Sequence, residues 1–191
     1  MNHIKLRRVL ALLLAAVLCA GLLTACGDRD GEDEQINKNI IAQQGGDPVP
    51  FTEEFDTTKR YNTQIVGSTL CIAFNGIQND TRYKVPYFTA AGDTITVTAN
   101  ATTESERNKT YRVALWKKVD GGAEYVGNGD HSGTMEFTAD GTNYTAQFSG
   151  LEPGAEYKVT LAYDGRKYYM SGQLSVQGLA GAEQVVQEED D

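Results

Sequence analysis

The chain has 191 residues, a formal net charge of −9, 20 glycines and ten tyrosines. This length suits one domain of ordinary size with residues left over for flexible segments. The acidic balance argues against binding to nucleic acid or electrostatic docking on anionic lipid, because these polyanions would be repelled. Frequent threonine, glycine and tyrosine, without long amphipathic patterns, favour a β-rich fold.

Residues 1–25 have the three zones of a secretory signal peptide. Lys5, Arg7 and Arg8 form a basic start, residues 9–25 are the uncharged run VLALLLAAVLCAGLLTA, and the end is rich in small residues. We therefore exclude this segment from the fold. Its removal leaves 14 Lys and Arg against 26 Asp and Glu, which is a net charge of −12.

The apolar run ends in Leu23-Thr24-Ala25-Cys26, which is an apolar residue, two small residues and a cysteine. These four residues resemble the lipobox of bacterial lipoproteins. The resemblance implies that a diacylglycerol is attached to the Cys26 thiol, that the signal is cleaved between Ala25 and Cys26, and that acyl chains such as palmitate hold the protein at a lipid bilayer. An uncleaved membrane helix and a plain secreted protein are the alternatives.

Gly27, rather than an aspartate, follows Cys26. The lipoprotein resemblance then implies a chain anchored to the cell membrane on its extracytoplasmic side, with a Gram-positive cell favoured. Once Cys19 is removed and Cys26 is modified, Cys71 is the single remaining thiol, so no internal disulfide is expected. Cys71 lies in the apolar stretch STLCIAFNG and is predicted to be a small buried side chain.

Two segments lack the apolar density needed to bury a core. Residues 26–64 are acidic, then polar, then rich in Gly and Pro, and they are predicted to form a mostly disordered tether. The acidic spacing near its start does not match a calcium-binding loop. Residues 179–191 end in an acidic run and are predicted to form a disordered tail.

Residues 65–178 alternate between apolar and polar side chains with a period of two, which indicates strands with one buried and one wet face. The turn signals AAGD, DGG, GNGD, ADG, EPG and YDG separate these strands. We expect an all-β antiparallel sandwich of about seven to eight strands. The apolar positions of the alternating stretches include Leu70, Ile72, Phe74, Ile95, Val97, Tyr111, Val113, Leu115, Met135, Phe137, Val159, Leu161, Leu174 and Val176.

The stretch GLEPGAEYKVTLAY carries Leu151, Pro153 and Tyr157. It resembles the corner between strands E and F of fibronectin type III domains, with Ala155 in place of the usual threonine. The resemblance implies a tyrosine corner, in which the Tyr157 hydroxyl bonds to the backbone a few residues upstream. Trp116 lies on the strand that carries a tryptophan in immunoglobulin-type domains, although no disulfide is beside it. The expected sandwich is therefore immunoglobulin-like or fibronectin type III-like, without strict membership of either family.

The chain offers few catalytic groups, and no catalytic, metal or cofactor site is predicted. His131 is the one histidine outside the signal, and its neighbours Asp130 and Ser132 share a turn-like stretch, where a triad rarely converges. Glu104 and Glu106 lie in a hydrophilic loop rather than across a cleft. The sequence has neither a zinc ligand set nor a phosphate-cradling loop. The prediction is that the protein is not an enzyme, and a hydrolase is the least favoured function.

Three aromatic residues are candidates for ligand contact. Trp116 and Tyr169 are out of phase with their buried neighbours, and Tyr125 lies near a turn. Outward rings can stack on a sugar or anchor a protein, although they can also cover the edge of the core. The predicted function is binding or adhesion at a bacterial cell surface, with a cell-wall glycan or a protein as ligand. The alternative is a structural spacer or envelope-assembly component without its own ligand.

Overall fold

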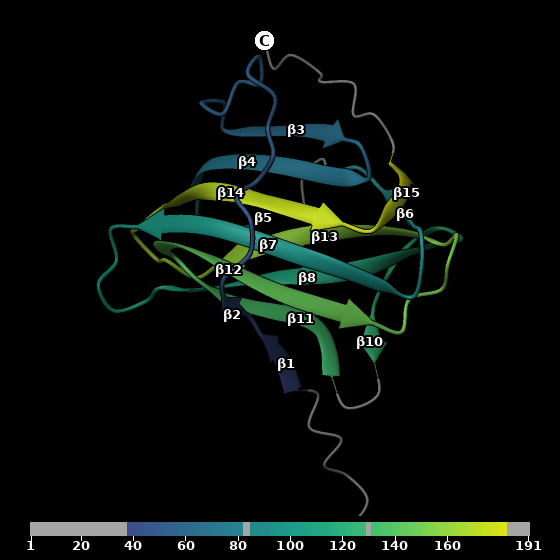
Figure 1. The fold of residues 1–191 in the computed structure, drawn as a ribbon. Coiled ribbons are helices and arrows are strands. Elements are labelled where there is room, and N and C mark those ends of the chain that lie inside the picture. The colour runs from purple at the N-terminus through teal and green to yellow at the C-terminus, as the bar shows by residue number, and fades with distance from the viewer. Residues whose placement is uncertain (1–37, 82–84, 129–130, 183–191) are drawn as a thin grey trace, which may run out of the picture. The chain divides into compact units, whose positions relative to one another are not determined.

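The computed structural model describes residues 38–81, 85–128 and 131–182. The regular secondary structure within these residues consists of β-strands (Figure 1). Eight strands have six to ten residues, in agreement with the number expected from the alternation. They are β3 (Tyr61–Val66), β4 (Thr69–Ile77), β7 (Thr94–Thr103), β8 (Thr110–Val119), β11 (His131–Thr138), β12 (Asp140–Ser149), β13 (Glu156–Tyr163) and β14 (Met170–Gln177). Seven shorter strands are β1 (Lys38–Ile41), β2 (Gln43–Gln44), β5 (Asn79–Thr81), β6 (Phe88–Ala90), β9 (Gly122–Tyr125), β10 (Gly127–Asn128) and β15 (Leu179–Ala182).

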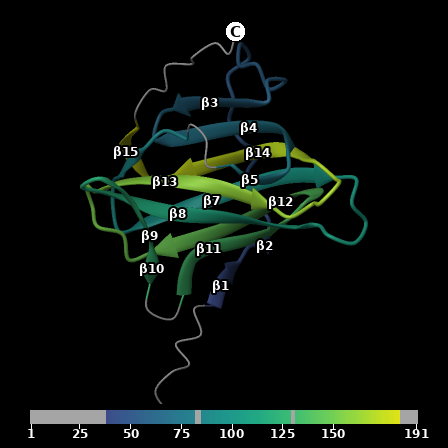
Figure 2. The same cartoon turned by 180° about the vertical axis from the view of Figure 1, so that it is seen from behind.

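The strands form two sheets, which confirms the predicted β-sandwich. The nine-stranded sheet has the order β1-β11-β8-β13-β6-β15, with β5, β9 and β10 attached to its strands, and the six-stranded sheet has the order β2-β12-β7-β14-β4-β3 (Figures 1 and 2). The pairs within the described residues are antiparallel, except that β1 is parallel to β11.

One strand departs from the immunoglobulin arrangement, in which the last two strands share a sheet. Here β13 belongs to the nine-stranded sheet, whereas β14 crosses to the six-stranded sheet and pairs with both β7 and β4. The fold is therefore an immunoglobulin-like sandwich in its layers and not in its strand order.

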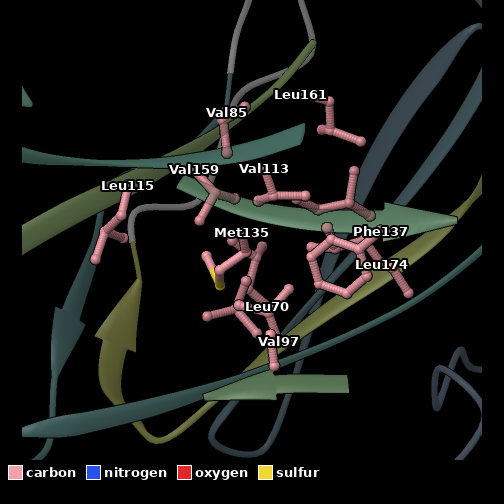
Figure 3. Packing of buried hydrophobic residues seen from close by; sticks show 14 of the residues in the cluster. Leu70, Val85, Val97, Val113, Leu115, Met135, Phe137, Val159, Leu161 and Leu174 are labelled. Atoms are coloured by element: carbon pink, nitrogen blue, oxygen red, sulfur yellow. The ribbon is translucent and has the colours of Figure 1, made fainter. Parts of the chain in front are cut away.

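The core lies between the inner faces of the two sheets, as the alternation predicted. Figure 3 shows Val97, Leu70 and Leu174 of the six-stranded sheet beside Val113 and Met135 of the nine-stranded sheet. All five side chains are fully buried. Burial of such side chains stabilises the fold by roughly 1.5–3 kcal/mol each, relative to leaving them exposed.

The connection from β12 to β13 contains the hydrogen bond expected of a tyrosine corner. The Tyr157 hydroxyl accepts a hydrogen bond from the backbone N–H of Glu152 at 2.9 Å. Leu151 is buried beside this turn, Pro153 is exposed, and Gly154 has a φ of +82°, which favours glycine. The bond ties the chain down at the point where it crosses between sheets.

The predicted tether is wrong from residue 38 onward. β1 pairs with β11, β2 pairs with β12, and β3 pairs with β4 over six residues. Short polar segments join a sheet through main-chain hydrogen bonds, which do not require apolar side chains. The first part of the tether, residues 26–37, lies outside the described residues, as do the predicted signal peptide and the Ala25–Cys26 cleavage and lipidation site.

Residues 45–60, which we call the strap, cross the outer face of the six-stranded sheet (Figure 1). Gly46 lies close to Thr98 of β7, and a Cβ atom at position 46 would come within 2.8 Å of the Thr98 side chain. Farther along, the Cys71 sulfur of β4 lies 4.0 Å from the Pro50 carbonyl oxygen. Cys71 is fully buried, as predicted, and burial raises its pKa to about 11.

The predicted start of the disordered tail, at residue 179, is also wrong. Residues 179–182 form β15, which pairs with β6, and Leu179 is buried in the core. The alternation stops before this short strand, so no local pattern predicts its pairing with β6. Residues 183–191, including the acidic run, lie outside the described residues.

Candidate functional site

The outer face of the nine-stranded sheet carries two of the three predicted contact residues side by side. Trp116 of β8 and Tyr125 of β9 are directly opposite in the strand register. Their ring centroids lie 5.4 Å apart with an interplanar angle of 72°, which is an edge-to-face arrangement. Trp116 is half-buried, whereas Tyr125 is 40% exposed. We call these two residues the aromatic pair.

Hydroxyl groups on neighbouring strands orient both rings. The Trp116 indole N–H donates a hydrogen bond to the Thr160 hydroxyl of β13 at 3.0 Å. The Tyr125 hydroxyl is hydrogen-bonded to the Thr134 hydroxyl of β11. The aromatic pair is therefore held by bonds to β13 on one side and to β11 on the other. Such bonds reduce the number of rotamers that a ligand must order on binding.

Charged side chains lie on the same face beside the aromatic pair. Lys158 pairs with Trp116 in the register of β13 and β8. The Lys158 and Lys118 ammonium groups lie 5.2 Å and 5.0 Å from the Tyr87 ring centroid, and Lys118 also forms an ion pair with Glu156 at 3.0 Å. The face thus combines aromatic, hydroxyl and cationic groups within the reach of one extended ligand.

Tyr169 does not join the aromatic pair. It is 57% exposed, as predicted, and it lies in the connection between β13 and β14, where its carbonyl oxygen accepts a hydrogen bond from Thr103 at 2.9 Å. Trp116 is paired near the beginning of β13, whereas Tyr169 follows the far end of that strand at Tyr163. Roughly 16 Å of β13 therefore lie between the position opposite Trp116 and the end of the strand that precedes Tyr169.

The structure does not bring together the described residues that were considered for catalysis. The Ser132 hydroxyl donates a hydrogen bond to the Asn39 side chain at 2.7 Å, so its hydrogen points to β1. Asp130 and the His131 side chain lie outside the described residues. Glu104 and Glu106 are both exposed in the connection between β7 and β8.

Residues 38–81, 85–128 and 131–182 contain no group of three or more His, Cys, Asp or Glu side chains that could hold a metal ion. Nor does a helix of sufficient length and apolarity to cross a membrane occur in those ranges.

Sequence reasoning missed a second group of polar residues, on the outer face of the six-stranded sheet. Asn75, Asn100 and Gln173 line a depression there with hydroxyl side chains and Thr57 of the strap. Their outward phase was readable in the alternation. Their convergence was not, because it depends on the pairing of three strands and on the path of the strap.

Comparison with known proteins gives little. No protein-family model and no curated protein matches the chain. A solved structure described as a Glycosylation Associate Protein (Gap123) complex from Streptococcus agalactiae shares 12% identity and a TM-score of 0.32. The match covers 81% of this chain and 50% of that chain. This similarity is too low to carry a statement about fold or function.

Proposed function

We propose that this protein is a lipid-anchored binding module on the extracytoplasmic side of a bacterial cell membrane, and that its aromatic pair contacts a cell-wall glycan. The Leu23-Thr24-Ala25-Cys26 sequence supports the anchor. The observation that carries the binding is the hydrogen-bonded pair of the half-buried Trp116 and the exposed Tyr125 on the outer face of the nine-stranded sheet.

A glycan suits this face for physical reasons. The C–H side of a sugar ring is apolar and packs on an aromatic ring, while its hydroxyls bond to groups beside the ring. Thr134 and Lys158 are half-buried and provide such groups next to the aromatic pair, whereas Thr160 is buried and holds Trp116 from within the sheet. Because bonds within the protein already orient the rings, binding orders few additional side chains.

Co-sedimentation of the full chain with purified cell walls tests the glycan ligand, in a detergent without sugar head groups. Trp116→Ala and Tyr125→Ala should each weaken binding about tenfold or more, as expected for truncation of a central aromatic side chain. Tyr169→Ala is the matched control, because Tyr169 is exposed and lies apart from the aromatic pair. Thermal unfolding of each variant separates lost contact from lost structure.

Three outcomes would contradict the glycan proposal. Wild-type protein could fail to sediment with the walls. Tyr169→Ala could weaken binding as much as Trp116→Ala, which would show that the aromatic pair is not the contact. The wild type could bind a protein rather than the glycan of the walls, and a folded Trp116→Ala variant could fail to bind that protein. This result would assign the same face to a protein ligand.

The anchor has its own test, which is independent of the ligand. Mass spectrometry of the N-terminal peptide from membranes should find Cys26 as the first residue, carrying a diacylglycerol. Cys26→Ser should abolish this mass and leave the signal uncleaved at Ala25. An unmodified Cys26 in the wild-type protein would refute the lipid anchor and leave the glycan proposal standing.

A further inference from the structure

The outer face of the six-stranded sheet is hollowed beside the strap by a depression of about 250 Å³. Three adjacent strands form its floor, and one row of the register there contains Ala73 of β4, Gln173 of β14 and Asn100 of β7. Ser171 and Thr102 form the next row. Thr57 of the strap completes the wall.

Small residues keep the floor low. Ala73 contributes one methyl group, and Gly172 contributes only backbone to the lining. A Cβ atom at position 172 would lie 2.3 Å from the Asn100 carbonyl oxygen and 2.6 Å from the Ala101 Cα. Any side chain at position 172 would therefore push β14 away from β7, which explains why glycine occupies the tightest point beneath the depression.

The hydrogen bonds of two lining amides fix their orientation. The Asn75 amide nitrogen donates to the carbonyl oxygens of Thr57 and Lys59, at 2.7 Å each. The Asn100 amide nitrogen donates to the Gly141 carbonyl oxygen and the Asn143 side-chain oxygen, at 2.8 Å each. Both donor groups are thus occupied. The side-chain oxygens of Asn75 and Asn100 accept no hydrogen bond from the described residues and remain available as acceptors.

Two further lining residues supply donors. Gln173 is half-buried, and its side chain makes no hydrogen bond within the described residues, so its amide offers two donors and an acceptor. The Ser171 hydroxyl accepts a bond from the Gly76 backbone N–H at 3.0 Å, which leaves its own O–H as a donor. Donors and fixed acceptors therefore alternate over a single small surface.

The lining selects an uncharged ligand rich in hydroxyl groups. None of its eight residues is ionisable, so an ionic ligand would lose water without gaining an opposite charge. Ala73 is the one purely aliphatic side chain, and the other apolar atoms of the lining belong to polar residues or to backbone, so a ligand that fits must offer both C–H and hydroxyl groups. The volume is below the roughly 300–1,000 Å³ of sites for drug-sized ligands. A hydroxyl group both donates and accepts, as this lining requires.

We propose that this depression binds one neutral sugar unit of a glycan, through Gln173, Ser171 and the side-chain oxygens of Asn75 and Asn100. The site lies on the opposite sheet from the aromatic pair, so it does not depend on Trp116 or Tyr125. It would give the module a second glycan contact with a different chemistry, based on hydrogen bonds rather than on stacking.

The test is an NMR titration of the 15N-labelled full chain, in a detergent without sugar head groups. The probes are cellotetraose, maltotetraose and the tetramer of N-acetylglucosamine, each raised to about 20 mM so that a Kd in the millimolar range can still be measured. The side-chain amide signals of Asn75, Asn100 and Gln173 report directly on the depression. At least one neutral probe should shift them in a saturable manner.

Variants of two glutamines on the same strand provide the matched comparison. Gln173→Met removes the hydrogen-bonding groups at similar size and should weaken binding about three- to tenfold, as followed by the Asn75 and Asn100 signals. Gln177→Met makes the same change on the same face of β14, outside the depression, and should leave the Kd unchanged. Thr102→Val, at an exposed position, serves as a second variant if Gln173→Met does not fold.

The possible results separate this site from the aromatic pair. Trp116→Ala should weaken cell-wall binding through the other face and leave the titration of the Gln173 signals intact. The inference is overturned if none of the three probes shifts the amide signals, if folded Gln173→Met and Thr102→Val variants both bind like the wild type, or if Trp116→Ala removes the response.

Discussion

Two buried tyrosines of the core should respond in opposite ways to the loss of the hydroxyl group. Tyr157 and Tyr111 are 2% and 1% exposed, so their environments are equally dry. The Tyr157 hydroxyl accepts the hydrogen bond from the Glu152 N–H at 2.9 Å. The Tyr111 hydroxyl has no hydrogen-bond partner in the described residues, and burial together with the Asp140 charge raises its pKa.

Tyr157→Phe should lower the free energy of unfolding by about 1–2 kcal/mol, because it removes one hydrogen bond and leaves the Glu152 N–H without its partner. Tyr111→Phe should be neutral or stabilising by up to about 1 kcal/mol, because it removes a buried hydroxyl that gains nothing in the folded state. In a domain of this size, 1 kcal/mol corresponds to a change in Tm of about 2–4 °C.

Urea unfolding followed by the fluorescence of Trp116, the single tryptophan, measures both variants against the wild type. The slope of the unfolding free energy with urea should stay the same, since the exposed surface hardly changes. Equal losses in both variants would refute the reasoning, because the two tyrosines differ in their hydroxyl partners and not in burial. A stable Tyr157→Phe variant would show that water replaces the bond at the corner.

Three further predictions test the packing and electrostatics of the sandwich. Gly133→Ala should unfold the domain or destabilise it by about 3 kcal/mol or more, because the added Cβ would lie 1.9 Å from the Val126 carbonyl oxygen. Urea titration measures this loss, and a variant as stable as the wild type would mean that β11 can shift. Iodoacetamide at pH 8 should label Cys71 far more slowly in the native protein than in urea, because the native thiol is buried and its pKa is raised to about 11. Peptide mass measures the labelling, and equal rates in the two states would contradict this prediction. The pKa of Asp140 is lowered below 3.8, chiefly by a hydrogen bond from the Thr142 N–H, so its contribution to stability is present above that pH and lost as the pH falls. Asp140→Asn should therefore lose less stability on acidification than the wild type, and an unchanged acid profile would count against this role.

The local pattern of the sequence was sufficient for several features of the fold. Alternation with a period of two located seven of the eight long strands, all but β3, and inner residues such as Val113 and Leu174, because a strand exposes its two faces in turn. The spacing of Leu151, Pro153 and Tyr157 located the turn before β13. The same phase argument placed Trp116 on the outer face of β8.

Edge pairing was the part of the fold that local pattern could not determine. β1 and β2 have four and two residues, too few for a visible alternation, and they join their sheets through main-chain hydrogen bonds that leave no trace in side-chain periodicity. The crossing of β14 to the six-stranded sheet depends on pairing between strands distant in the chain. Residues 38–64, which were predicted to be part of a tether, therefore form β1, β2, the strap and most of β3.

By itself, the sequence determined the acidic charge, the positions of seven long strands and the outward phase of individual side chains, since each is a property of neighbouring residues. Only the tertiary structure decided which outward side chains meet. It brought Tyr125 to Trp116 and kept Tyr169 away, and it gathered Asn75, Asn100 and Gln173 beneath the strap. The physical reason is that a binding surface arises from strand register and chain crossing, which are set by long-range hydrogen bonds and by burial of the whole core.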